Sequence, residues 1–390
     1  MKTSVVIIGG GPAGLLLARL LQLNDIDCVV IERRSREYVL SRIRAGVLEQ
    51  GLVDLLHEAE VDSRLQAVGE VHRRFDIAFH DDVCRIDMDK LTDGKSVTVY
   101  GQTEVTRDLY DALDAAGTRI FHDAEGVELH ELDTDAPYIT FEANEKKHRI
   151  SAQFIAGCDG FHGPSRQAMP VTVRHDYELV YPFGWLGILT ETPPVAEELI
   201  YAGHESGFAL CSLRSRALSR YYVQCPIDDD VADWSDDRFW DVLKSRLPTD
   251  VAESLITGPT IEKSIAPLRS FVSEPMSWHR LFLAGDAAHI VPPTGAKGLN
   301  LAASDVYYLS HALIRFFNQN DDTGLINYSA TALARVWKAE RFSWWMTQLL
   351  HFFPNQNKFE QRLRAAEFDY LKSSRAAQTA LAENYAGLAY

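Results

Sequence analysis

The fold is decided near the start of the chain by the stretch Ser4-Val-Val-Ile-Ile-Gly-Gly-Gly-Pro-Ala-Gly14, followed by the helix-forming run Leu15–Leu23 and by Cys28-Val-Val-Ile-Glu32. The apolar runs on both sides of the glycines are rich in β-branched residues, which is typical of buried parallel strands. Two such strands joined by a helix form a βαβ unit of about 30 residues. The stretch therefore predicts an α/β fold built on a Rossmann-like parallel sheet.

The turn of this unit carries Gly9-x-Gly11-x-x-Gly14, a pattern that lets a pyrophosphate approach the backbone at a helix N-terminus. Glu32 ends the second strand, where a carboxylate accepts hydrogen bonds from an adenosine ribose. A glycine turn beside a surface glutamate is the alternative interpretation. The combination predicts a dinucleotide site that includes Gly9, Gly11, Gly14 and Glu32.

Two later segments, Ile155-Ala-Gly-Cys-Asp159 and Leu281-Phe-Leu-Ala-Gly-Asp286, each lead an apolar strand into an aspartate. Ligands bind at the carboxyl ends of strands in open α/β sheets, and the ribityl hydroxyls of FAD need such acceptors. For Asp159 a helix-cap role is an equally good interpretation. For Asp286 we favour the cofactor role, because the loop Pro292-Pro-Thr-Gly-Ala-Lys-Gly-Leu-Asn300 follows it and can aim a helix N-terminus at an anionic flavin ring.

Composition excludes several functional classes. The formal net charge of −16 argues against a nucleic-acid surface, which needs clustered Lys and Arg. Five scattered cysteines form no CxxC pair and no zinc spacing, so we expect reduced thiols, no metal site and an organic redox cofactor. Glycines interrupt the first apolar run, so no membrane span is expected and the protein is predicted to be cytoplasmic.

Changes in the predicted secondary structure along the chain divide it into four segments. Residues 1–180 are the first part of the FAD-binding domain, and residues 181–267 are a substrate-binding antiparallel sheet. Residues 268–325 return to the FAD-binding domain with the flavin-ring loop, and residues 326–390 are a helical region. The run from Trp337 to Met346 is too apolar to face water on all sides, so it indicates core or a subunit interface. We expect a homodimer.

A substrate pocket is suggested by alternation on two predicted strands. Ser212 and Arg214 share one strand face, and Arg220 and Tyr222 share a face of the next strand. Convergence of Ser, Arg and Tyr suits a carboxylate, which a guanidinium binds as a fork. Taken alone, arginines on a solvated sheet would be the better interpretation.

Several stretches together resemble a known family along essentially the whole chain. They are Arg42-Ile-Arg-Ala-Gly-Val-Leu-Glu-Gln50, Val99–Arg107, Tyr181–Gly187, Lys263–Phe271 and the loop Gly285–Asn300. The sequence resembles the single-component aromatic flavoprotein monooxygenases, and among them those that act on 4-hydroxybenzoate. The resemblance implies hydroxylation of 4-hydroxybenzoate at C3 to protocatechuate with FAD, NADH or NADPH and O2, by way of a flavin C4a-hydroperoxide, in the degradation of aromatic compounds.

The resemblance also implies roles for individual residues. Ser212, Arg214 and Tyr222 would hold the substrate carboxylate, Tyr201, Tyr385 and His72 would conduct the phenolic proton, and Pro293 and Thr294 would contact the reacting side of the substrate. Further contacts to FAD would come from Arg42, Arg44, Gln102, Arg220, Gly298, Leu299 and Asn300. The nicotinamide coenzyme would meet Arg33, Tyr38, Arg44, His162 and Arg269. Arginines in the segment 33–38 favour a 2′-phosphate, whereas Glu37 repels it, so both NADH and NADPH stay open.

Other functions remain as alternatives. A related hydroxylase acting on another substituted benzoate would share most of these features. A flavin-binding sensor without hydroxylase activity would need the cofactor residues but not the carboxylate pocket. An NAD-dependent dehydrogenase is disfavoured, because Gly285 and Asp286 would have no role in it.

Overall fold

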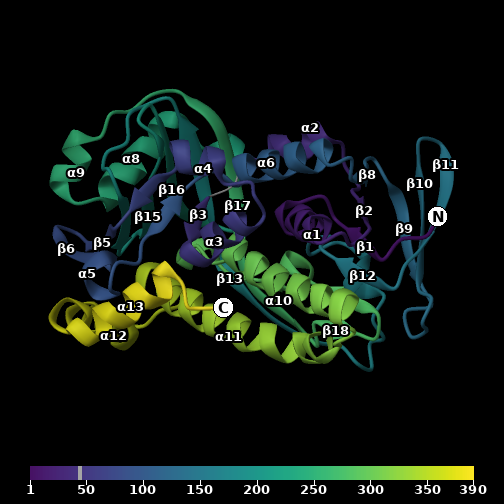
Figure 1. Cartoon of the computed structure of the whole chain (residues 1–390). Coiled ribbons are helices and arrows are strands. Elements are labelled where there is room, and N and C mark those ends of the chain that lie inside the picture. Colours follow the sequence, from purple (N-terminus) through teal and green to yellow (C-terminus); the bar gives the residue numbers. More distant parts are fainter. Residues whose placement is uncertain (43–45) are drawn as a thin grey trace.

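The computed structural model describes residues 1–42 and 46–390 (Figure 1). The first elements are β1 (Val5–Ile8), α1 (Pro12–Leu23) and β2 (Cys28–Ile31), and every residue of the two strands is buried. β1 and β2 pair in parallel, with Val5 opposite Cys28. The predicted βαβ unit is therefore present. Its helix begins at Pro12 rather than Leu15, because proline fits the first helical position, where no N–H is needed.

This unit belongs to a six-stranded sheet in the order β18-β19-β12-β1-β2-β8. The other strands are β8 (Arg119–Phe121), β12 (Phe154–Gly157), β18 (Ser277–Trp278) and β19 (Leu281–Leu283), and β18 alone among them is antiparallel to its neighbour. β12 and β19 lie next to β1, so the carboxyl ends of these three strands meet at one edge. The segments that contain Gly9, Asp159 and Asp286 are thereby brought together.

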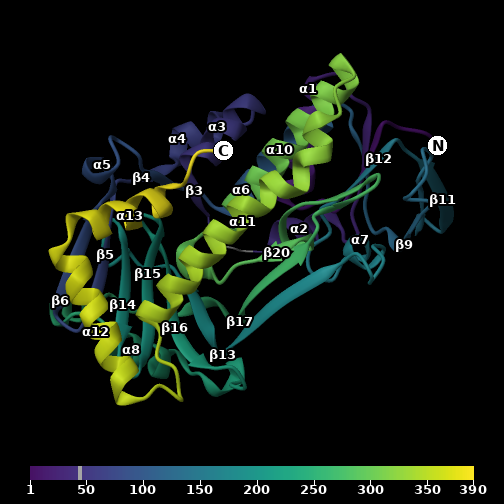
Figure 2. The same ribbon diagram turned by 90° about the horizontal axis from the view of Figure 1, so that it is seen from below.

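The second large sheet has eight strands in the order β20-β17-β13-β16-β15-β14-β5-β6. Its strands are β5 (Arg74–Phe79), β6 (Asp82–Asp87), β13 (His175–Thr190), β14 (Leu199–His204), β15 (Gly207–Ser215), β16 (Leu218–Pro226), β17 (Thr260–Glu274) and β20 (His289–Ile290). Figure 2 shows the long strands β13 and β17 running from this sheet towards the first. The antiparallel character expected for residues 181–267 is present, and β5 and β6 join the sheet from a part of the chain where no strand was expected. The boundaries of the four segments stay predictions.

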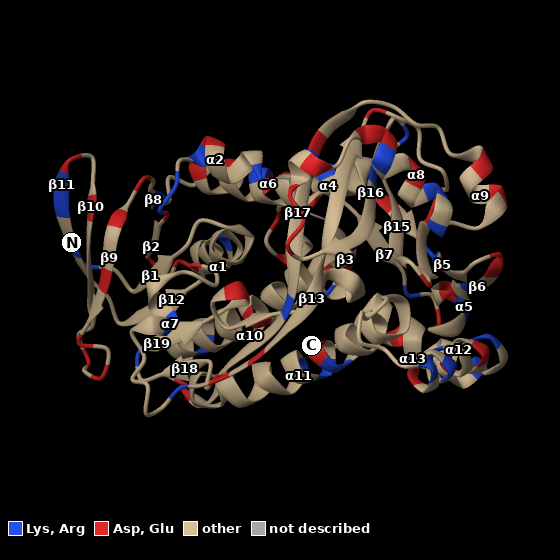
Figure 3. Cartoon of the chain, turned by 180° about the vertical axis from the view of Figure 1, so that it is seen from behind, with Lys and Arg blue, Asp and Glu red and all other residues tan. Residues whose placement is uncertain are grey.

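Smaller elements fill the periphery. Two three-stranded sheets are formed by β3 (Val47–Glu49), β7 (Val97–Val99) and β4 (Glu70–His72), and by β11 (Lys146–Ser151), β10 (Tyr138–Ala143) and β9 (Glu125–His130). Further helices are α2 (Arg36–Ser41), α3 (Gln50–Glu58), α4 (Ser63–Val68), α5 (Met88–Leu91), α6 (Gln102–Ala115), α7 (Pro164–Gln167), α8 (Asp236–Arg246) and α9 (Thr249–Ser254), with short 3-10 turns η1 (Val231–Asp233), η2 (Gly285–Ala287) and η3 (Pro293–Gly295). Figure 3 shows acidic and basic residues interspersed over these outer elements.

The last part of the chain is helical, as expected. It comprises α10 (Gly298–Gln319), α11 (Thr323–Leu350), α12 (Lys358–Ser373) and α13 (Arg375–Ala386). α10 and α11 lie side by side, and α12 and α13 lie beside β5 and β6 (Figures 1 and 2). On α11, Phe342 and Met346 are buried, whereas Trp337 and Trp344 are 42% and 46% exposed. In the part of the chain that the structure describes, no helix has the length and apolarity needed to cross a membrane.

Candidate active site

The glycines of the first turn have two different functions. A Cβ on Gly9, whose φ is +114°, would lie 2.1 Å from the carbonyl oxygen of Cys158, and a Cβ on Gly14 would lie 2.0 Å from that of Gly9. These two glycines are required by packing. A Cβ on Gly11 would meet no atom within 4 Å, so this glycine faces open space.

Gly11 is also the N-cap of α1, and no side chain caps this helix or places an acidic group in its first turn. The free N–H groups and the positive end of the helix dipole therefore face the open space in front of Gly11. This arrangement suits a pyrophosphate, because the cap position leaves room for the anion.

The Glu32 carboxylate is oriented by the backbone around it. The N–H of Gly10 donates to Oε2 at 2.6 Å, and the N–H of Arg34 donates to Oε1 at 2.8 Å. Each oxygen keeps further lone-pair capacity, and Glu32 is only half-buried. The carboxylate is therefore held at the edge of the turn, where ribose hydroxyls can donate to it.

The loop that carries Asp286 is fixed by a pair of residues that sequence reasoning missed. Oδ2 of Asp305, on α10, accepts from the backbone N–H of Gly285 at 2.8 Å and lies 2.6 Å from Nε2 of His289. Asp305 and His289 are buried, and Asp286 between the two tied residues is exposed. Burial lowers the pKa of His289, but the carboxylate of Asp305 outweighs burial, so the net shift of this pKa is upward. One carboxylate thus clamps both ends of a five-residue loop whose apex presents Asp286.

Asp159 has a visible structural role. Its Oδ2 accepts from the N–H of Ser165 at 2.9 Å and so serves the N-terminus of α7. Its Oδ1 is buried and has no hydrogen-bond partner among the described residues. The helix-cap interpretation is therefore present in the structure, and the contact of Asp159 with the cofactor stays a prediction.

The residues expected around the flavin ring surround the start of α10. Lys297, the N-cap residue, makes no side-chain cap, and a Cβ on Gly298 would meet only Cγ2 of Val291 at 3.9 Å. Leu299 is half-buried beside it. The Asn300 side chain is occupied, since Oδ1 accepts from the Glu49 N–H and Nδ2 donates to the Val47 carbonyl, each at 2.9 Å. The side-chain amide of Asn300 is therefore engaged within the protein, and the contact of Asn300 with the cofactor stays a prediction.

The other predicted contacts to FAD are more scattered. Gln102 is the first residue of α6 and is half-buried, and the exposed Arg42 lies with its guanidinium 5.7 Å from the ring centre of Tyr38. Arg44 lies outside the described residues. The structure thus tests none of these three contacts.

The predicted substrate residues lie on adjacent strands of the eight-stranded sheet. Tyr201 on β14 is directly opposite Leu210 on β15, and Leu210 is directly opposite Tyr222 on β16. Ser212 is opposite Arg220 in the same register. Side chains two positions apart share a face, so these residues lie on one face of the sheet, as the alternation predicted.

A glycine lets the two large side chains of β16 bend over the sheet. Gly187 on β13 is opposite Tyr222, and a Cβ there would lie 2.7 Å from the Tyr222 ring and 3.1 Å from Nη2 of Arg220. Arg220 is buried, forms an ion pair with Glu262 at 3.2 Å, and stacks over the Tyr222 ring at 5.2 Å. The charge of Arg220 is thus neutralised within the protein.

Nε and Nη1 of both Arg214 and Arg220 are buried without a hydrogen-bond partner among the residues the structure describes. Arg214 differs in that it forms no ion pair with any of these residues, whereas Arg220 pairs with Glu262. Burial lowers the pKa of Arg214, against the opposing effect of Tyr222 beside it. Ser212 is buried, and its hydroxyl makes only a 3.3 Å contact to the carbonyl of Leu213. A desolvated guanidinium without a paired anion is costly, so Arg214 suits a carboxylate ligand, whose binding here stays a prediction.

Two buried tyrosines, one on β14 and one on α13, meet beside the same sheet. The hydroxyls of Tyr201 and Tyr385 are 2.7 Å apart, and Phe75 stacks on the Tyr385 ring with centroids 4.2 Å apart. Burial raises the pKa of both hydroxyls. The structure therefore brings together two residues that are 184 positions apart in sequence.

His72 is buried on β4, and neither ring nitrogen has a hydrogen-bond partner within residues 1–42 and 46–390. Burial lowers the pKa of its imidazole to about 4. The structure shows no hydrogen bond between His72 and Tyr385, so the outward part of the proton path stays a prediction.

The loop Pro293–Gly295 is held against α11. The hydroxyl of Thr294 lies 2.9 Å from that of Thr347, and a Cβ on Gly295 would lie 2.7 Å from Oγ of Ser343. Thr294 is buried and Pro293 is exposed. α11 thus fixes the loop whose backbone is predicted to contact the substrate.

The residues predicted for the nicotinamide coenzyme form two groups. Arg33 and Tyr38 are exposed near α2, and the guanidinium of Arg34 lies 5.2 Å from the ring centre of Tyr38. His162 is exposed next to Phe161, and Arg269 lies over the Phe161 ring at 4.7 Å and pairs with Glu178 at 3.3 Å. The structure describes no contact between the two groups.

These features fit FAD. The open face at Gly11, the uncapped helix N-terminus and the exposed carboxylate of Asp286 provide for a pyrophosphate and a ribityl chain. Among the described residues, no group of three or more His, Cys, Asp or Glu side chains is placed to hold a metal ion.

Fold and site together define an FAD-binding protein, and residues 2–343 match the model of the family described as FAD binding domain. The chain is 56% identical over 390 residues to the p-hydroxybenzoate hydroxylase of Acinetobacter baylyi, covering 100% of this chain and 96% of that protein. It is 24% identical to the rifampicin monooxygenase of Streptomyces venezuelae over 79% of this chain and 63% of that protein. The crystal structure of p-nitrophenol 4-monooxygenase PnpA from Pseudomonas putida DLL-E4 has the same fold, with a TM-score of 0.82, 18% identity and full coverage of both chains.

The chain therefore belongs to the FAD-binding monooxygenases and, within them, to the p-hydroxybenzoate hydroxylase family.

Proposed function

We propose that this enzyme hydroxylates 4-hydroxybenzoate at C3, consuming NADH or NADPH, a proton and O2 and releasing protocatechuate, the oxidised coenzyme and water. The observation that carries the proposal is that two groups of polar side chains lie beside the same strands. Arg214, without a counterion, and the Tyr201–Tyr385 pair lie on or beside strands β14 to β16. Strands lie about 4.8 Å apart, so the backbones of Tyr201 and Tyr222 are separated by about 10 Å. A benzoate with a para hydroxyl has its polar groups at opposite ends, as this arrangement requires.

The carboxylate end orients the substrate. The buried Arg214 guanidinium offers one edge of its planar group as a two-pronged donor to the two carboxylate oxygens, which supplies the anion that it lacks within the protein. The hydroxyls of Ser212 and Tyr222 lie on the same sheet face and add further donors. Binding here fixes the position of the ring, so that the carbon next to the phenol is presented to the cofactor.

The phenol end moves the proton. Burial keeps the hydroxyls of Tyr201 and Tyr385 neutral, so they transfer a proton by exchanging hydrogen bonds rather than by ionising. Loss of the phenolic proton makes the ring more nucleophilic, which electrophilic hydroxylation requires. His72, which burial keeps neutral above a pKa of about 4, is the proposed next acceptor.

FAD, when bound at the first turn and the start of α10, supplies the acceptor for the coenzyme's hydride and the centre at which oxygen is activated. The protein's own contribution is to exclude water. Trp185 stacks on Phe208 with centroids 4.8 Å apart and packs on Tyr222 at 5.3 Å, which covers this face of the sheet with aromatic rings.

The decisive experiment follows the oxidation of NADH and of NADPH by the flavin-loaded enzyme, with and without 4-hydroxybenzoate, and assays protocatechuate and peroxide together. We expect strong stimulation with product formed nearly mole for mole. Stimulation that yields mainly peroxide would indicate a different substituted benzoate as substrate, which product formation across ring isomers would identify. Absence of any stimulation would indicate a flavin-binding protein without hydroxylase activity. The preferred coenzyme is read from the same assay.

A substitution at the phenol end tests the relay. Tyr201→Phe removes one hydroxyl of the buried pair and leaves Arg214 intact. We expect unchanged FAD binding and substrate affinity within about threefold, but a product-to-coenzyme ratio well below one, with peroxide making up the difference. Normal coupling in this variant would remove Tyr201 from the proton path.

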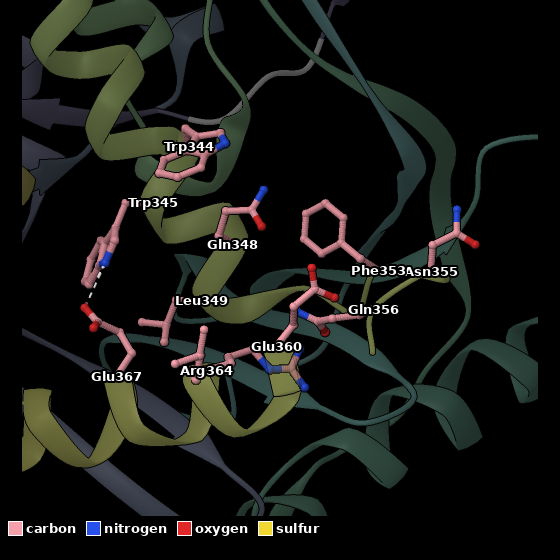
Figure 4. Close-up of a pocket in the computed structure, with 11 residues that line it drawn as sticks. Trp344, Trp345, Gln348, Leu349, Phe353, Asn355, Gln356, Glu360, Arg364 and Glu367 are labelled. Carbon is pink, nitrogen blue, oxygen red and sulfur yellow. Dashed lines mark hydrogen bonds between the residues drawn. The ribbon is translucent and has the colours of Figure 1, made fainter. Parts of the chain in front are cut away.

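We propose a homodimer formed through the face of α11 and α12. A groove there is lined by Trp344, Trp345, Gln348, Leu349, Phe353, Asn355, Gln356, Glu360, Leu363, Arg364 and Glu367 (Figure 4). Phe359 and Leu363 on α12 are 71% and 55% exposed, which is unusual for apolar side chains that are not covered by a partner. Sedimentation at several concentrations tests this proposal, with Leu363→Asp expected to shift the enzyme to monomer and an exposed Lys338→Asp on α11 expected to have no effect.

We also propose a cytoplasmic location. Its support is that Cys28, Cys84, Cys158, Cys211 and Cys225 are all free thiols, as expected in a reducing compartment. Fractionation of the producing cells checks this.

A further inference from the structure

Three charged side chains from distant parts of the chain meet in the interior beside the tyrosine pair. Glu49, on β3, accepts at Oε1 from Nζ of Lys297 at 2.6 Å and at Oε2 from Nη2 of Arg335 at 2.9 Å. All three residues are less than 10% exposed. Two buried cations share one carboxylate, so this charge cluster holds one positive charge in excess. Buried charges that do not cancel are rare unless they have a function.

The cluster is joined to the proton relay through helix α13. Nζ of Lys297 also donates to the backbone carbonyl of Tyr385 at 3.0 Å. The hydroxyl of the same Tyr385 lies 2.7 Å from that of Tyr201. A shift of Lys297 would therefore move the backbone on which one half of the relay depends.

Arg335 holds the chain segment that follows α13. Its Nη1 donates to the carbonyl of Leu388 at 2.6 Å and contacts that of Ala389 at 3.2 Å, and its guanidinium lies 4.7 Å from the ring centre of Tyr390. Gly387 fits closely against the cluster, since a Cβ there would lie 2.4 Å from Oε2 of Glu49 at a φ of +107°. The segment 387–390 thus closes over the charge cluster.

We propose that Arg335 is a positioning residue for hydroxylation. By binding Glu49 on one side and the carbonyls of Leu388 and Ala389 on the other, it fixes Tyr385 opposite Tyr201 and leaves the cluster with a net positive charge next to the relay. This inference rests on the proposed function, because the relay acts on the phenolic proton of a bound hydroxybenzoate.

Removal of Arg335 has two consequences. Glu49 then pairs with Lys297 alone, so the net charge of the cluster falls from one positive charge to zero. The segment 387–390 also loses the bonds from Arg335 to Leu388 and Ala389, so this end of α13 is held less firmly. At an effective dielectric constant of about 20, one unit charge roughly 10 Å away shifts the pKa of a group by about one unit. The ionisation of the bound phenol is therefore the property to measure.

The test titrates the ultraviolet absorbance of 4-hydroxybenzoate bound to the flavin-loaded enzyme against pH. For Arg335→Met we expect the pKa of the bound phenol to rise by about one unit and the fraction of peroxide to increase at least threefold. Arg335→Lys keeps the charge, and we expect it to restore most of the pKa shift while the peroxide fraction stays raised, because a lysine cannot reach Glu49 and both carbonyls together. Lys338→Met removes an exposed cation from the same helix and is the matched control, with both quantities unchanged.

The outcomes separate this inference from the proposed function. If the unsubstituted enzyme does not bind 4-hydroxybenzoate, the proposed function fails and 4-hydroxybenzoate is the wrong probe. If it does bind and Arg335→Met leaves the phenol pKa and the peroxide fraction unchanged, the role of Arg335 is refuted. Should Arg335→Met fail to fold, Gly387→Ala decides, since it keeps every charge but forces the segment away from Glu49. A raised peroxide fraction then supports positioning through this segment, and normal coupling overturns it.

Discussion

The dinucleotide turn and the substrate pocket are built in opposite ways. The turn lies near the start of the chain, and its one acidic side chain finds partners nearby, since the Glu32 carboxylate accepts from the N–H groups of Gly10 and Arg34. The predicted substrate site combines strands β14 to β16 with helix α13, and buried donor atoms on Arg214 and Arg220 have no hydrogen-bond partner in the part of the chain that the structure describes. A carboxylate formed from a local stretch of chain can be satisfied by that stretch before a ligand binds. A site assembled from distant segments can retain a buried charge without an ion-pair partner, and here that charge, on Arg214, is the basis for the proposed carboxylate ligand.

The largest effect is expected where the turn is tightest. Gly14→Ala places a Cβ 2.0 Å from a backbone oxygen, and we expect it to cost at least about 3 kcal/mol of the free energy of unfolding. Gly11→Ala meets no atom within 4 Å and has a φ of −80°, so its stability should stay within about 1 kcal/mol of the original. Its FAD affinity should still fall at least tenfold. Urea unfolding of the apoprotein and quenching of FAD fluorescence measure the two quantities. Equal stabilities for the two variants would contradict the division of roles among the glycines.

The next effect concerns the unsatisfied charge of the pocket. Arg214→Gln removes the carboxylate's fork, and we expect the dissociation constant of 4-hydroxybenzoate to rise roughly a hundredfold, as loss of a charge-assisted bidentate contact predicts. The ligand-free protein should be no less stable, because a buried cation without a counterion opposes folding. The exposed Arg216 lies two residues further along, and Arg216→Gln should change the affinity less than twofold. A similar loss in both variants would mean that general charge, not the fork, attracts the substrate.

The contrast between these regions also explains what the sequence could predict. The βαβ unit and its glycines follow from local pattern, and the shared face of Ser212, Arg220 and Tyr222 follows from strand alternation, whereas Arg214 lies at an irregularity in the pairing between Leu213 and Ser215. The pairing of Tyr201 with Tyr385 was expected only from resemblance, because no local pattern joins residues 184 positions apart. The parallel pairing of β5 with β14 and the cluster of Glu49, Lys297 and Arg335 were missed for the same reason. Tertiary structure alone brings these residues together.

A smaller effect is expected in the pH dependence of stability. Burial lowers the pKa of His72 from an ordinary value near 6.5 to about 4, so the unfolded chain binds more protons than the folded one between these values. Stability from this residue is fully present above about pH 6.5 and is lost as the pH falls towards 4. Between pH 7 and pH 5 the loss amounts to about 2 kcal/mol. In His72→Leu the decline in stability over that range, measured by urea unfolding, should be smaller by this amount. An unchanged slope would show that His72 is solvated in the folded protein.

The smallest effect is expected at the loop Gly285–His289. This loop is short, like the turn at Gly9, but it is held by a residue of another element, as the substrate residues are. Asp305 clamps Gly285 and His289 with one carboxylate oxygen, and Asp286 between them is the predicted ribityl acceptor. Asp305→Asn keeps the shape but replaces two charge-assisted hydrogen bonds with neutral ones, which are roughly half as strong. We expect the dissociation constant of FAD to rise roughly tenfold, since the loop then has to be ordered by the cofactor. Ser304→Ala is the matched control, because the Ser304 hydroxyl bonds only to the carbonyl of Leu301 in its own helix, at 2.8 Å. FAD affinity is measured by titrating the apoproteins of both variants. Equal affinities would show that Asp305 does not position Asp286, and that the loop, like the turn at Gly9, holds its conformation without help from a distant residue.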